Sequence, residues 1–277
     1  MQNRVDPAQV PVFILAGGLG TRISEESQFR PKPMIEIGGE PILLHIMRSY
    51  YRFGFNDFVI CAGYRSWEIK QYFLTYSFRK THLEIDHRAD TTAPAQAFGA
   101  RKDQENWRVR VIDTGVDCMT GGRLARAFDS ISKEKFEHFA VTYGDGVSDV
   151  ALDLELADHL KTGLTGTILG VHPSARFGEL TVGTDRRVVD FSEKPQSRSD
   201  LINGGFFFFQ RKFRDYLSDH ADCILERAPL NQLAKDTQLS MYPHKGFWQP
   251  MDTLRDKTFL ESLLAEKKAP WLREGAE

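Results

Sequence analysis

The feature that most constrains the fold is an apolar run, VPVFIL (residues 10–15), that stops at a cluster of glycines. A short run rich in β-branched residues predicts a buried strand that leads directly into a loop. Helical spacing follows in residues 41–54, a second strand pattern in 57–63 and a second helical pattern in 66–78, with Ser66 as a candidate N-cap. Strand, helix, strand, helix in this order predicts a parallel sheet with crossover helices.

The rest of the chain mixes strand and loop patterns. We expect strands in residues 82–90 and 107–115, with a loop or insertion in 91–106 between them. A further apolar strand, broken by glycine, is expected at residues 139–146, and short strands followed by a helical tail from about residue 165 onward. The prediction is an α/β, Rossmann-like mixed sheet, mainly parallel and flanked by helices, with a smaller β-rich part.

Composition narrows the function classes. The formal net charge is −2, whereas nucleic-acid-binding domains usually carry a marked basic excess, so no nucleic-acid partner is expected. The N-terminus does not resemble a secretory signal, and no apolar run approaches the ~18 residues that span a bilayer, so no membrane partner is expected. The three cysteines, Cys61, Cys118 and Cys223, form no CxxC pair. Neither a zinc site nor a disulfide framework is predicted, and a reducing cytoplasm is the expected location.

The glycine loop, AGGLGTR (residues 16–22), stands where backbone N–H groups can converge on a phosphate. It fits neither familiar pattern. The Walker pattern requires Lys followed by Ser or Thr after its last glycine, and Arg22 stands five residues after Gly17 instead. The dinucleotide pattern requires a third glycine where Ile23 stands. On the glycines alone, a phosphate-binding loop and a plain tight turn remain equally open.

Two cations favour the phosphate-binding alternative. Arg22 offers a planar fork of donors that suits phosphate oxygens. Lys32 stands between Pro31 and Pro33, whose fixed φ angles restrict the backbone on either side of it. Asp145 follows an apolar strand in a glycine-flanked turn, at the carboxyl end of the strand where ligands of α/β proteins bind, although turns commonly hold aspartate.

The motif LAGGLGTR (residues 15–22), together with RPKPMIEIGGEPIL (30–43), resembles the signature of the sugar-1-phosphate nucleotidylyltransferases. Further segments, in order along the chain, resemble one branch of that family, the glucose-1-phosphate cytidylyltransferases. These segments are DTG (113–115), MTGGR (119–123), TYGDGVSDV (142–150), RFGEL (176–180), EKP (193–195), INGGFF (202–207) and GFWQPMDTLRDK (246–257). MTGGR resembles the loop that covers the pyrimidine and ribose in that branch.

The resemblance implies transfer of a cytidylyl group from CTP to glucose 1-phosphate, giving CDP-glucose and pyrophosphate. A sugar-phosphate oxygen attacks the α-phosphorus in line with the departing pyrophosphate. Because this nucleophile is already an anion, no catalytic base is required, and positioning, charge neutralisation and metal assistance carry the reaction. The family implies a single domain, 1–277, with a nucleotide-binding half at about 10–160 and a sugar-phosphate-binding half at about 165–265.

The resemblance also implies site residues. Mg²⁺ is the implied cofactor, held by Asp145 and Asp252, since this hard cation needs only one or two carboxylates besides phosphates and water. The implied catalytic residues are Arg22, Lys32 and Asp145. The implied nucleotide-binding residues are Leu15, Ala16, Gly17, Gly18, Leu19, Gly20, Thr21, Arg22, Lys32, Thr120, Gly121, Arg123 and Gly144. The implied sugar-phosphate-binding residues are Gly178, Glu193, Lys194, Asn203 and Gly204.

Other residues receive weaker interpretations. Asp256 is expected to be structural, and Trp248 either packs on the sugar or is structural. His82 and His87 fall on opposite faces of a strand, so a shared metal is not expected. Cys118 departs from the small hydroxyl residue expected beside MTGGR, which puts one contact there in doubt.

Several alternatives stay open. Base selection leaves no distinctive sequence trace, so a uridylyl- or thymidylyltransferase acting on a hexose 1-phosphate is the nearest alternative. A non-catalytic nucleotide-sugar sensor is the alternative from another class. The branch implies deoxysugar supply for surface polysaccharides and a homo-oligomer of unspecified size. The segment 91–106 fits a lid, an interface loop or an insertion.

Overall fold

The computed structural model describes residues 5–18, 20, 23, 30–79, 81–86, 95–98, 105–173, 179–182, 186–192 and 201–272. Its α-helices are α2 (Ile42–Tyr51), α3 (Ser66–Leu74), α4 (Thr120–Ser130), α5 (Leu152–Thr162), α6 (Ala228–Lys235) and α7 (Leu254–Ala265). Its 3₁₀-helices are η1 (Pro7–Gln9), η3 (Lys32–Met34), η4 (Tyr76–Phe78), η5 (Arg211–Tyr216) and η6 (Pro270–Leu272).

The strands are β1 (Val12–Ala16), β2 (Glu36–Ile37), β3 (Glu40–Pro41), β4 (Asp57–Ala62), β5 (His82–Ile85), β6 (Ala95–Phe98), β7 (Arg108–Asp113), β8 (His138–Tyr143), β9 (Gly146–Ser148), β10 (Gly166–Val171), β11 (Glu179–Val182), β12 (Val188–Ser192), β13 (Ile202–Gln210), β14 (Leu239–His244) and β15 (Trp248–Pro250). Seven of them form the main sheet, and the rest pair in two-stranded ribbons.

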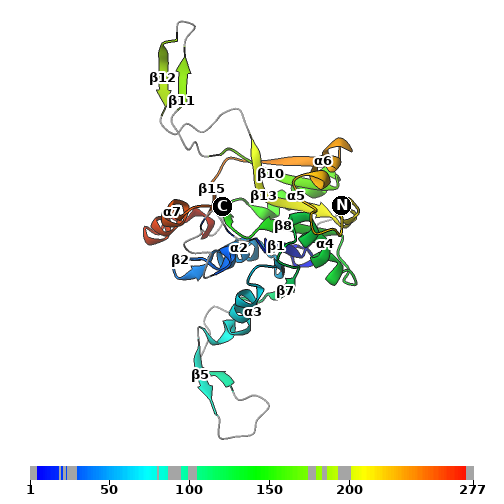
Figure 1. Ribbon diagram of the computed structural model, residues 1–277, viewed down its shortest axis with the longest axis vertical. Helices are drawn as coiled ribbons and strands as arrows, with labels where there is room; N and C mark the ends of the chain where they lie inside the picture. The colour runs from blue at the N-terminus through cyan, green and yellow to red at the C-terminus, as the bar shows by residue number, and fades with distance from the viewer. Residues whose placement is uncertain are drawn as a thin grey trace.

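The main sheet has the order β14-β10-β13-β8-β1-β4-β7 and lies at the centre of the molecule (Figure 1). Pairings β8–β1, β1–β4, β4–β7 and β10–β14 are parallel. Strand β13 is antiparallel to both of its neighbours, so the other strands of this sheet all run in one direction. The amino end of β13 therefore lies at the same edge as the carboxyl ends of β8 and β1, where ligands of open α/β sheets bind.

Two apolar layers cover the sheet, and strand β13 shows how the sequence divides between them. Phe206 and Phe208 pack into the layer that contains α2 and α5, whereas Phe207 and Phe209 pack into the layer that contains α4, η5 and α6. The side chains alternate because successive residues of a strand point to opposite faces. Each buried phenylalanine contributes about 1.5–3 kcal/mol, so β13 holds the two layers together.

The predicted fold class is confirmed, and four local predictions are wrong. Segment 91–106 contains strand β6, because its residues pair with β5. The predicted helical tail also contains strands β14 and β15, which pair with β10 and β9 over long sequence separations. The resemblance implies a loop at MTGGR, but helix α4 begins at Thr120. Arg65, not Ser66, is the N-cap of α3, because the Ser66 hydroxyl donates to Asp113 at 2.7 Å instead.

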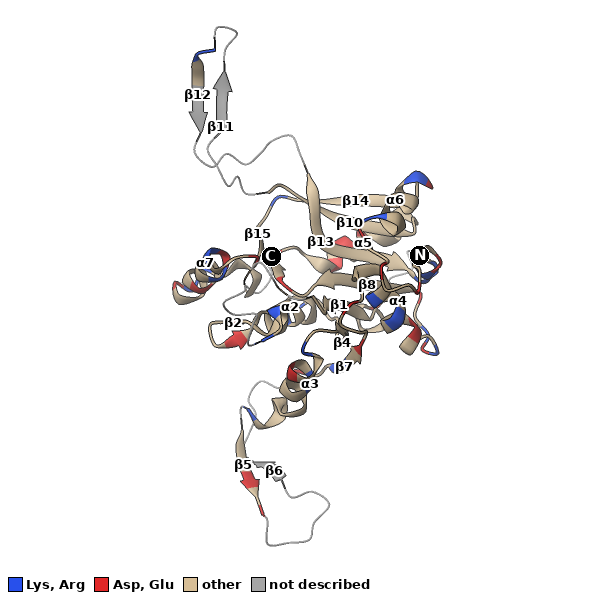
Figure 2. Ribbon diagram, in the orientation of Figure 1, with Lys and Arg blue, Asp and Glu red and all other residues tan. Residues whose placement is uncertain are grey.

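Surface charge is mixed rather than one-sided. Acidic and basic residues are interspersed along α7 (Figure 2), in keeping with a formal net charge of −2. Within the described ranges, none of the helices is both long and apolar enough to cross a bilayer.

Candidate active site

A pocket of about 360 Å³ opens at the carboxyl ends of β1 and β8. Its lining residues are Leu15, Ala16, Gly17, Gly18, Gly20, Lys32, Pro33, Cys118, Met119, Thr120, Arg123, Tyr143, Gly144, Asp145 and Asp252. The structure thus gathers most of the predicted nucleotide-binding residues with both predicted metal ligands. Gly121 is not among the lining residues, and Leu19, Thr21 and Arg22 lie outside the described part of the chain.

A short β-ribbon brings the two aspartates together. Strand β9 begins at Gly146, directly after Asp145, and pairs antiparallel with β15, whose Pro250 is the partner of Gly146. The N–H of Met251 then donates to the carbonyl of Asp145 at 2.7 Å. Asp252 follows immediately, so the two carboxylates flank the same end of the ribbon.

Lys32 lies between these carboxylates. Its Nζ is 2.6 Å from Oδ2 of Asp145 and 2.7 Å from Oδ1 of Asp252, and its side chain is 11% exposed. Burial lowers the pKa of Lys32, but the charges and hydrogen bonds of the two aspartates outweigh burial and raise the pKa above its usual value. The ammonium therefore stays protonated at neutral pH.

The backbone around Lys32 explains its placement. Pro31, in extended conformation, is the N-cap of η3, and Pro33 is buried within that turn. A Cβ added to Gly144 would meet the Leu15 carbonyl at 2.9 Å and the Pro33 ring at 3.0 Å, so glycine permits the turn to approach the strand ends. The predicted role of the flanking prolines, to hold the lysine backbone in place, agrees with this packing.

The donor set fits a hard divalent cation. Asp145 and Asp252 direct carboxylate oxygens at one point, and a single ammonium neutralises only one of the two charges. No group of three or more His, Cys, Asp or Glu side chains within the described residues could hold a metal ion. A cation here would need oxygens from substrate phosphates and water as well, which is how Mg²⁺ usually binds.

Arg123 has a different environment from the one expected. Its guanidinium is buried and donates to the carbonyls of Ala62, Gly115, Gly17 and Val116 and to the hydroxyl of Thr114, at 2.7–3.3 Å. These acceptors lie at the ends of β1, β4 and β7. Arg123 therefore ties three strand ends to helix α4, and both of its terminal nitrogens donate to acceptors of the protein itself.

The glycines of the loop serve distinct purposes. A Cβ on Gly17 would lie 2.0 Å from Nη1 of Arg123, so Gly17 makes room for that guanidinium. A Cβ on Gly18 would meet nothing within 4 Å, and this residue is exposed toward the pocket. Gly20 has a φ of 66°, in the left-handed region that favours glycine. Among these residues, Gly18 has open space at the position of a side chain, so a ligand can approach its backbone closely.

Two of the predicted sugar-phosphate-binding residues, Asn203 and Gly204, contact residues of the pocket and of the β9–β15 ribbon. Asn203 donates from Nδ2 to the hydroxyl of Tyr143 at 3.2 Å and accepts from the N–H of Gly205 at 2.7 Å. The indole of Trp248 donates to the carbonyl of Gly204 at 2.6 Å, which links the β9–β15 ribbon to strand β13. Trp248 thus has a structural contact. Gly178, Glu193 and Lys194 lie outside the described residues.

Residues that the sequence did not single out support the site. Asp149 accepts from the N–H of Phe247 at 2.7 Å and lies 3.0 Å from Nε2 of His244, which holds the base of the ribbon. Burial raises the pKa of Asp149, but these partners outweigh burial and lower it. Asp256 forms a capping box with Thr253 at the start of α7, which confirms its predicted structural role. Asp149 lies within the family-like segment 142–150, but no sequence pattern assigned it a role.

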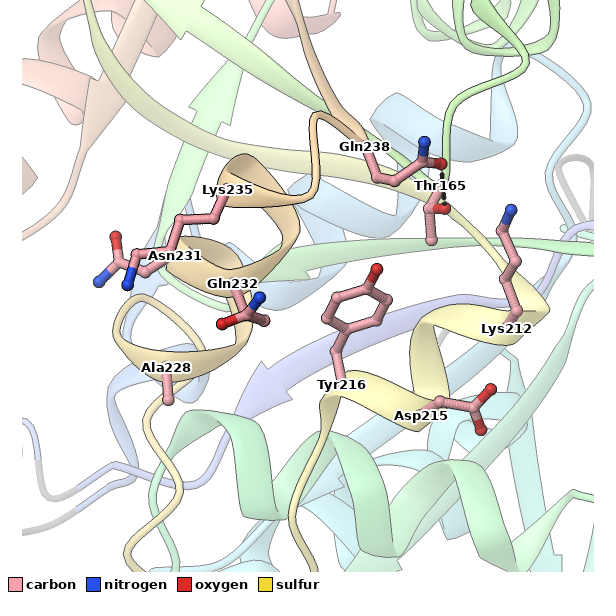
Figure 3. A pocket seen from close by; sticks show the side chains of 9 residues that line it. All are labelled: Thr165, Lys212, Asp215, Tyr216, Ala228, Asn231, Gln232, Lys235 and Gln238. Atoms are coloured by element: carbon pink, nitrogen blue, oxygen red, sulfur yellow. Dashed lines mark hydrogen bonds between the residues drawn. The ribbon is translucent and has the colours of Figure 1, made fainter.

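A larger pocket lies elsewhere and lacks these features. It has a volume of about 880 Å³ and lies between η5 and α6, with Tyr216 at its centre and Lys212 and Lys235 near its rim (Figure 3). The hydroxyl of Thr165 donates to Gln238 at 2.8 Å within it. Its lining, among the residues that the structure describes, contains neither a glycine loop nor a pair of carboxylates, so size alone does not identify the active site.

Known proteins are similar to this chain over most of its length. The family described as nucleotidyl transferase matches residues 11–253. The glucose-1-phosphate cytidylyltransferase of Salmonella typhimurium is 43% identical over 258 residues, covering 93% of this chain and 97% of the relative. A protein of Bacillus subtilis named "Probable glucose-1-phosphate cytidylyltransferase" is 38% identical over the same shares of the two chains.

A solved structure supports the fold. HddC from Yersinia pseudotuberculosis, crystallised in complex with GMP-PN, superposes with a TM-score of 0.62 at 22% identity, covering 92% of this chain and 99% of that one. At this identity the likeness concerns the fold alone.

Proposed function

This chain belongs to the nucleotidyl transferase family, and we propose that it transfers a cytidylyl group from CTP to glucose 1-phosphate, giving CDP-glucose and pyrophosphate. One observation carries the proposal. In a chain 43% identical to a glucose-1-phosphate cytidylyltransferase, the ammonium of Lys32 lies within 2.7 Å of carboxylate oxygens of both Asp145 and Asp252, at the ligand-binding edge of the sheet.

The donor nucleotide would lie along the pocket. Gly18 has open space on its Cα, so phosphate oxygens could approach its backbone and accept from its N–H, as they do in anion-binding loops. Thr120 and Met119, at the start of α4, line the far wall where the ribose and base would lie. Arg22 remains a proposed catalytic residue for the leaving pyrophosphate on the strength of the family motif, as do Leu19 and Thr21 for phosphate binding.

The reaction needs alignment more than acid–base chemistry. The phosphate oxygen of glucose 1-phosphate attacks the α-phosphorus of CTP, the P–O bond to pyrophosphate breaks, and no proton has to be removed first. Lys32 would neutralise charge on the α-phosphate as the transition state forms. Asp145 and Asp252 would hold Mg²⁺, which when bound neutralises phosphate charge and fixes the phosphate oxygens in line.

The acceptor side is proposed from neighbouring strands. Asn203 and Gly204, at the amino end of β13, lie on the strand next to β8, which ends just before Asp145. Glu193 and Lys194 would contact the sugar hydroxyls and the sugar phosphate, with Gly178 allowing close approach. We also propose that the working form is a homo-oligomer in the cytoplasm.

The test measures pyrophosphate release with glucose 1-phosphate and Mg²⁺, with CTP, UTP, dTTP, ATP and GTP supplied separately. We expect release with CTP and its loss in Asp145→Asn. Asp153→Asn, the same change at an exposed position on α5, is the matched control and should behave as wild type. Equal or faster turnover with UTP or dTTP would contradict the cytidylyl assignment, and silence with every triphosphate would favour a nucleotide-sugar sensor.

A further inference from the structure

Four polar side chains beside the pocket form one continuous hydrogen-bonded group, the Glu226 network: Thr120, Tyr143, Asn203 and Glu226. They come from four separate segments, namely the first turn of α4, the last residue of β8, the start of β13 and the loop before α6. Thr120 and Tyr143 line the pocket, whereas Glu226 lies behind them. The network therefore connects the nucleotide wall with the acceptor strand.

Glu226 divides its two carboxylate oxygens between the two sides. Tyr143 donates its hydroxyl to Oε1 at 2.5 Å, and Thr120 donates its hydroxyl to Oε2 at 2.7 Å. The Tyr143 hydroxyl also accepts from Nδ2 of Asn203 at 3.2 Å, and the Thr120 hydroxyl accepts from the N–H of Leu225 at 2.9 Å. Each hydroxyl is thus both donor and acceptor, which fixes its orientation.

The surrounding backbone holds the network in place. The N–H of Met119 donates to the carbonyl of Ala221 at 2.7 Å, and the N–H of Gly121 donates to the carbonyl of Cys223 at 2.9 Å. A Cβ on Gly121 would lie 2.6 Å from the Cys223 sulfur, so the two segments are in close contact. Gly121 thus serves this packing, which explains why it does not line the pocket.

The ring of Tyr143 is fixed as well. Gly205 has a φ of 78°, and a Cβ there would lie 2.4 Å from the ring, so the ring rests directly on the glycine backbone. The ring also packs edge-on against Phe207. Burial and the charge of Glu226 both raise the pKa of Tyr143, so its phenol remains a neutral donor.

We propose that Glu226 is a positioning residue that sets the distance and orientation between the bound nucleotide and the sugar phosphate. It acts through Tyr143 and Asn203 on the acceptor side and through Thr120 on the nucleotide side. The proposal rests on the proposed function, because it presumes that two substrates meet in this pocket. It assigns to Glu226 no contact with the reacting atoms.

The expected effect falls on kcat. In-line attack depends steeply on alignment, and misplacement by about 1 Å can slow a reaction by about 100-fold. Binding of the triphosphate depends mainly on other groups, so its KM should change little. A residue that only supported the fold would instead lower the thermal midpoint together with all activity.

The experiment compares Glu226→Gln, Tyr143→Phe and their double variant. The Glu226→Gln change turns an amide toward one of the two hydroxyl donors, which breaks one side of the network, whereas Tyr143→Phe keeps the ring packing and loses both hydroxyl bonds. Tyr216→Phe, the same change in the other pocket, is the matched control. We expect kcat to fall by about 10- to 100-fold in each single variant, with the KM for both substrates within about threefold. The double variant should be no slower than the slower single variant, since both break one network.

A second pair of variants keeps the test independent of folding defects at Glu226. Thr120→Val, which loses the hydroxyl, should have a lower kcat than Thr120→Ser, which retains it. An unchanged kcat in Glu226→Gln, multiplicative losses in the double variant, or equal rates in Thr120→Ser and Thr120→Val would each overturn the proposal. All variants are assayed with whichever triphosphate the wild type uses, so a switch from CTP contradicts the proposed function alone.

Discussion

The pocket and the buried side of helix α5 treat carboxyl groups in opposite ways. In the pocket, Asp145 and Asp252 share the ammonium of Lys32 at 2.6 and 2.7 Å. Behind the sheet, Glu155 on α5 is fully buried, and neither of its oxygens has a hydrogen-bond partner among the residues that the structure describes. Burial, with a smaller contribution from Asp158, raises the pKa of Glu155 from 4.5 to about 8.

The difference teaches that burial alone does not decide whether an acid is charged. Desolvation disfavours the ionised form of Glu155, whereas the pocket places the Lys32 ammonium at contact distance from both aspartates. The pocket carboxylates therefore remain available to a metal, whereas Glu155 is protonated at neutral pH. The variants below test this contrast, from the largest expected effect to the smallest.

The largest effect is expected from removing a pocket charge. Asp252→Asn keeps the shape of the side chain but leaves one carboxylate against Lys32, so divalent-cation binding should weaken. We expect kcat to fall by about 1,000-fold, or about 4 kcal/mol in the barrier, with the fold retained. Chelation with EDTA should silence the wild type, and excess Mg²⁺ should restore it. Full activity in Asp252→Asn would show that Asp252 holds no metal.

The buried guanidinium of Arg123 donates to neutral acceptors, so its loss should lower the stability of the protein rather than its activity. Arg123→Met keeps much of the side-chain volume but leaves carbonyls such as those of Gly17 and Gly115 without a donor. We expect the free energy of unfolding to fall by about 3 kcal/mol, measured by urea denaturation. Residual activity per folded molecule should survive below the midpoint. If Arg123→Met were stable but inactive, that result would instead support the predicted contact between Arg123 and the substrate.

Glu155 should make the free energy of unfolding depend on pH. Between pH 4.5 and about 8 the unfolded chain has ionised Glu155 and the folded chain has not, so unfolding releases a proton. Stability contributed by this group therefore falls as pH rises through that window, by up to about 1.4 kcal/mol per pH unit. Glu155→Gln cannot ionise and should remove this slope in urea titrations spaced across that window. If the free energy of unfolding fell equally with rising pH in the wild type and in Glu155→Gln, Glu155 would be ionised in the folded protein.

The smallest effect is expected at the base of the ribbon. The pKa of Asp149 is lowered, so the stability it contributes is present above its unfolded pKa and is lost as pH falls through the folded value. Its side chain is 33% exposed, so solvent screening should hold the contribution below about 1 kcal/mol. The wild type should lose stability as the solution is acidified below about pH 4. Asp149→Asn should lose less over the same range, and the difference should not exceed that amount. A larger loss, still present at neutral pH, would indicate repacking of the ribbon.

Local patterns predicted part of this site and could not predict the rest. The sequence could indicate Lys32 as a site residue because prolines flank it directly. It could indicate Asp145 because that residue follows a strand. The contact between them could not be predicted from local patterns, since Lys32 lies 113 residues before Asp145 and 220 before Asp252, and the pairing of β9 with β15 brings the two aspartates together. Arg123 resembles a ligand-binding arginine in sequence, but its acceptors are mainly backbone carbonyls, which no side-chain pattern reveals. Glu226 stands in an ordinary loop, and its role depends on hydroxyls from two other segments.

The reversed strand β13 has an evolutionary consequence. Its contact with β8 is a ladder of backbone hydrogen bonds, Phe206 opposite Thr142 through Gln210 opposite His138, which depends little on side-chain identity. That ladder ends at Phe206, so Asn203 and Gly204 lie just beyond it and take no part in the register with β8. Changes at these two positions would therefore leave the β8–β13 ladder in place, and with it the strand that leads to Asp145.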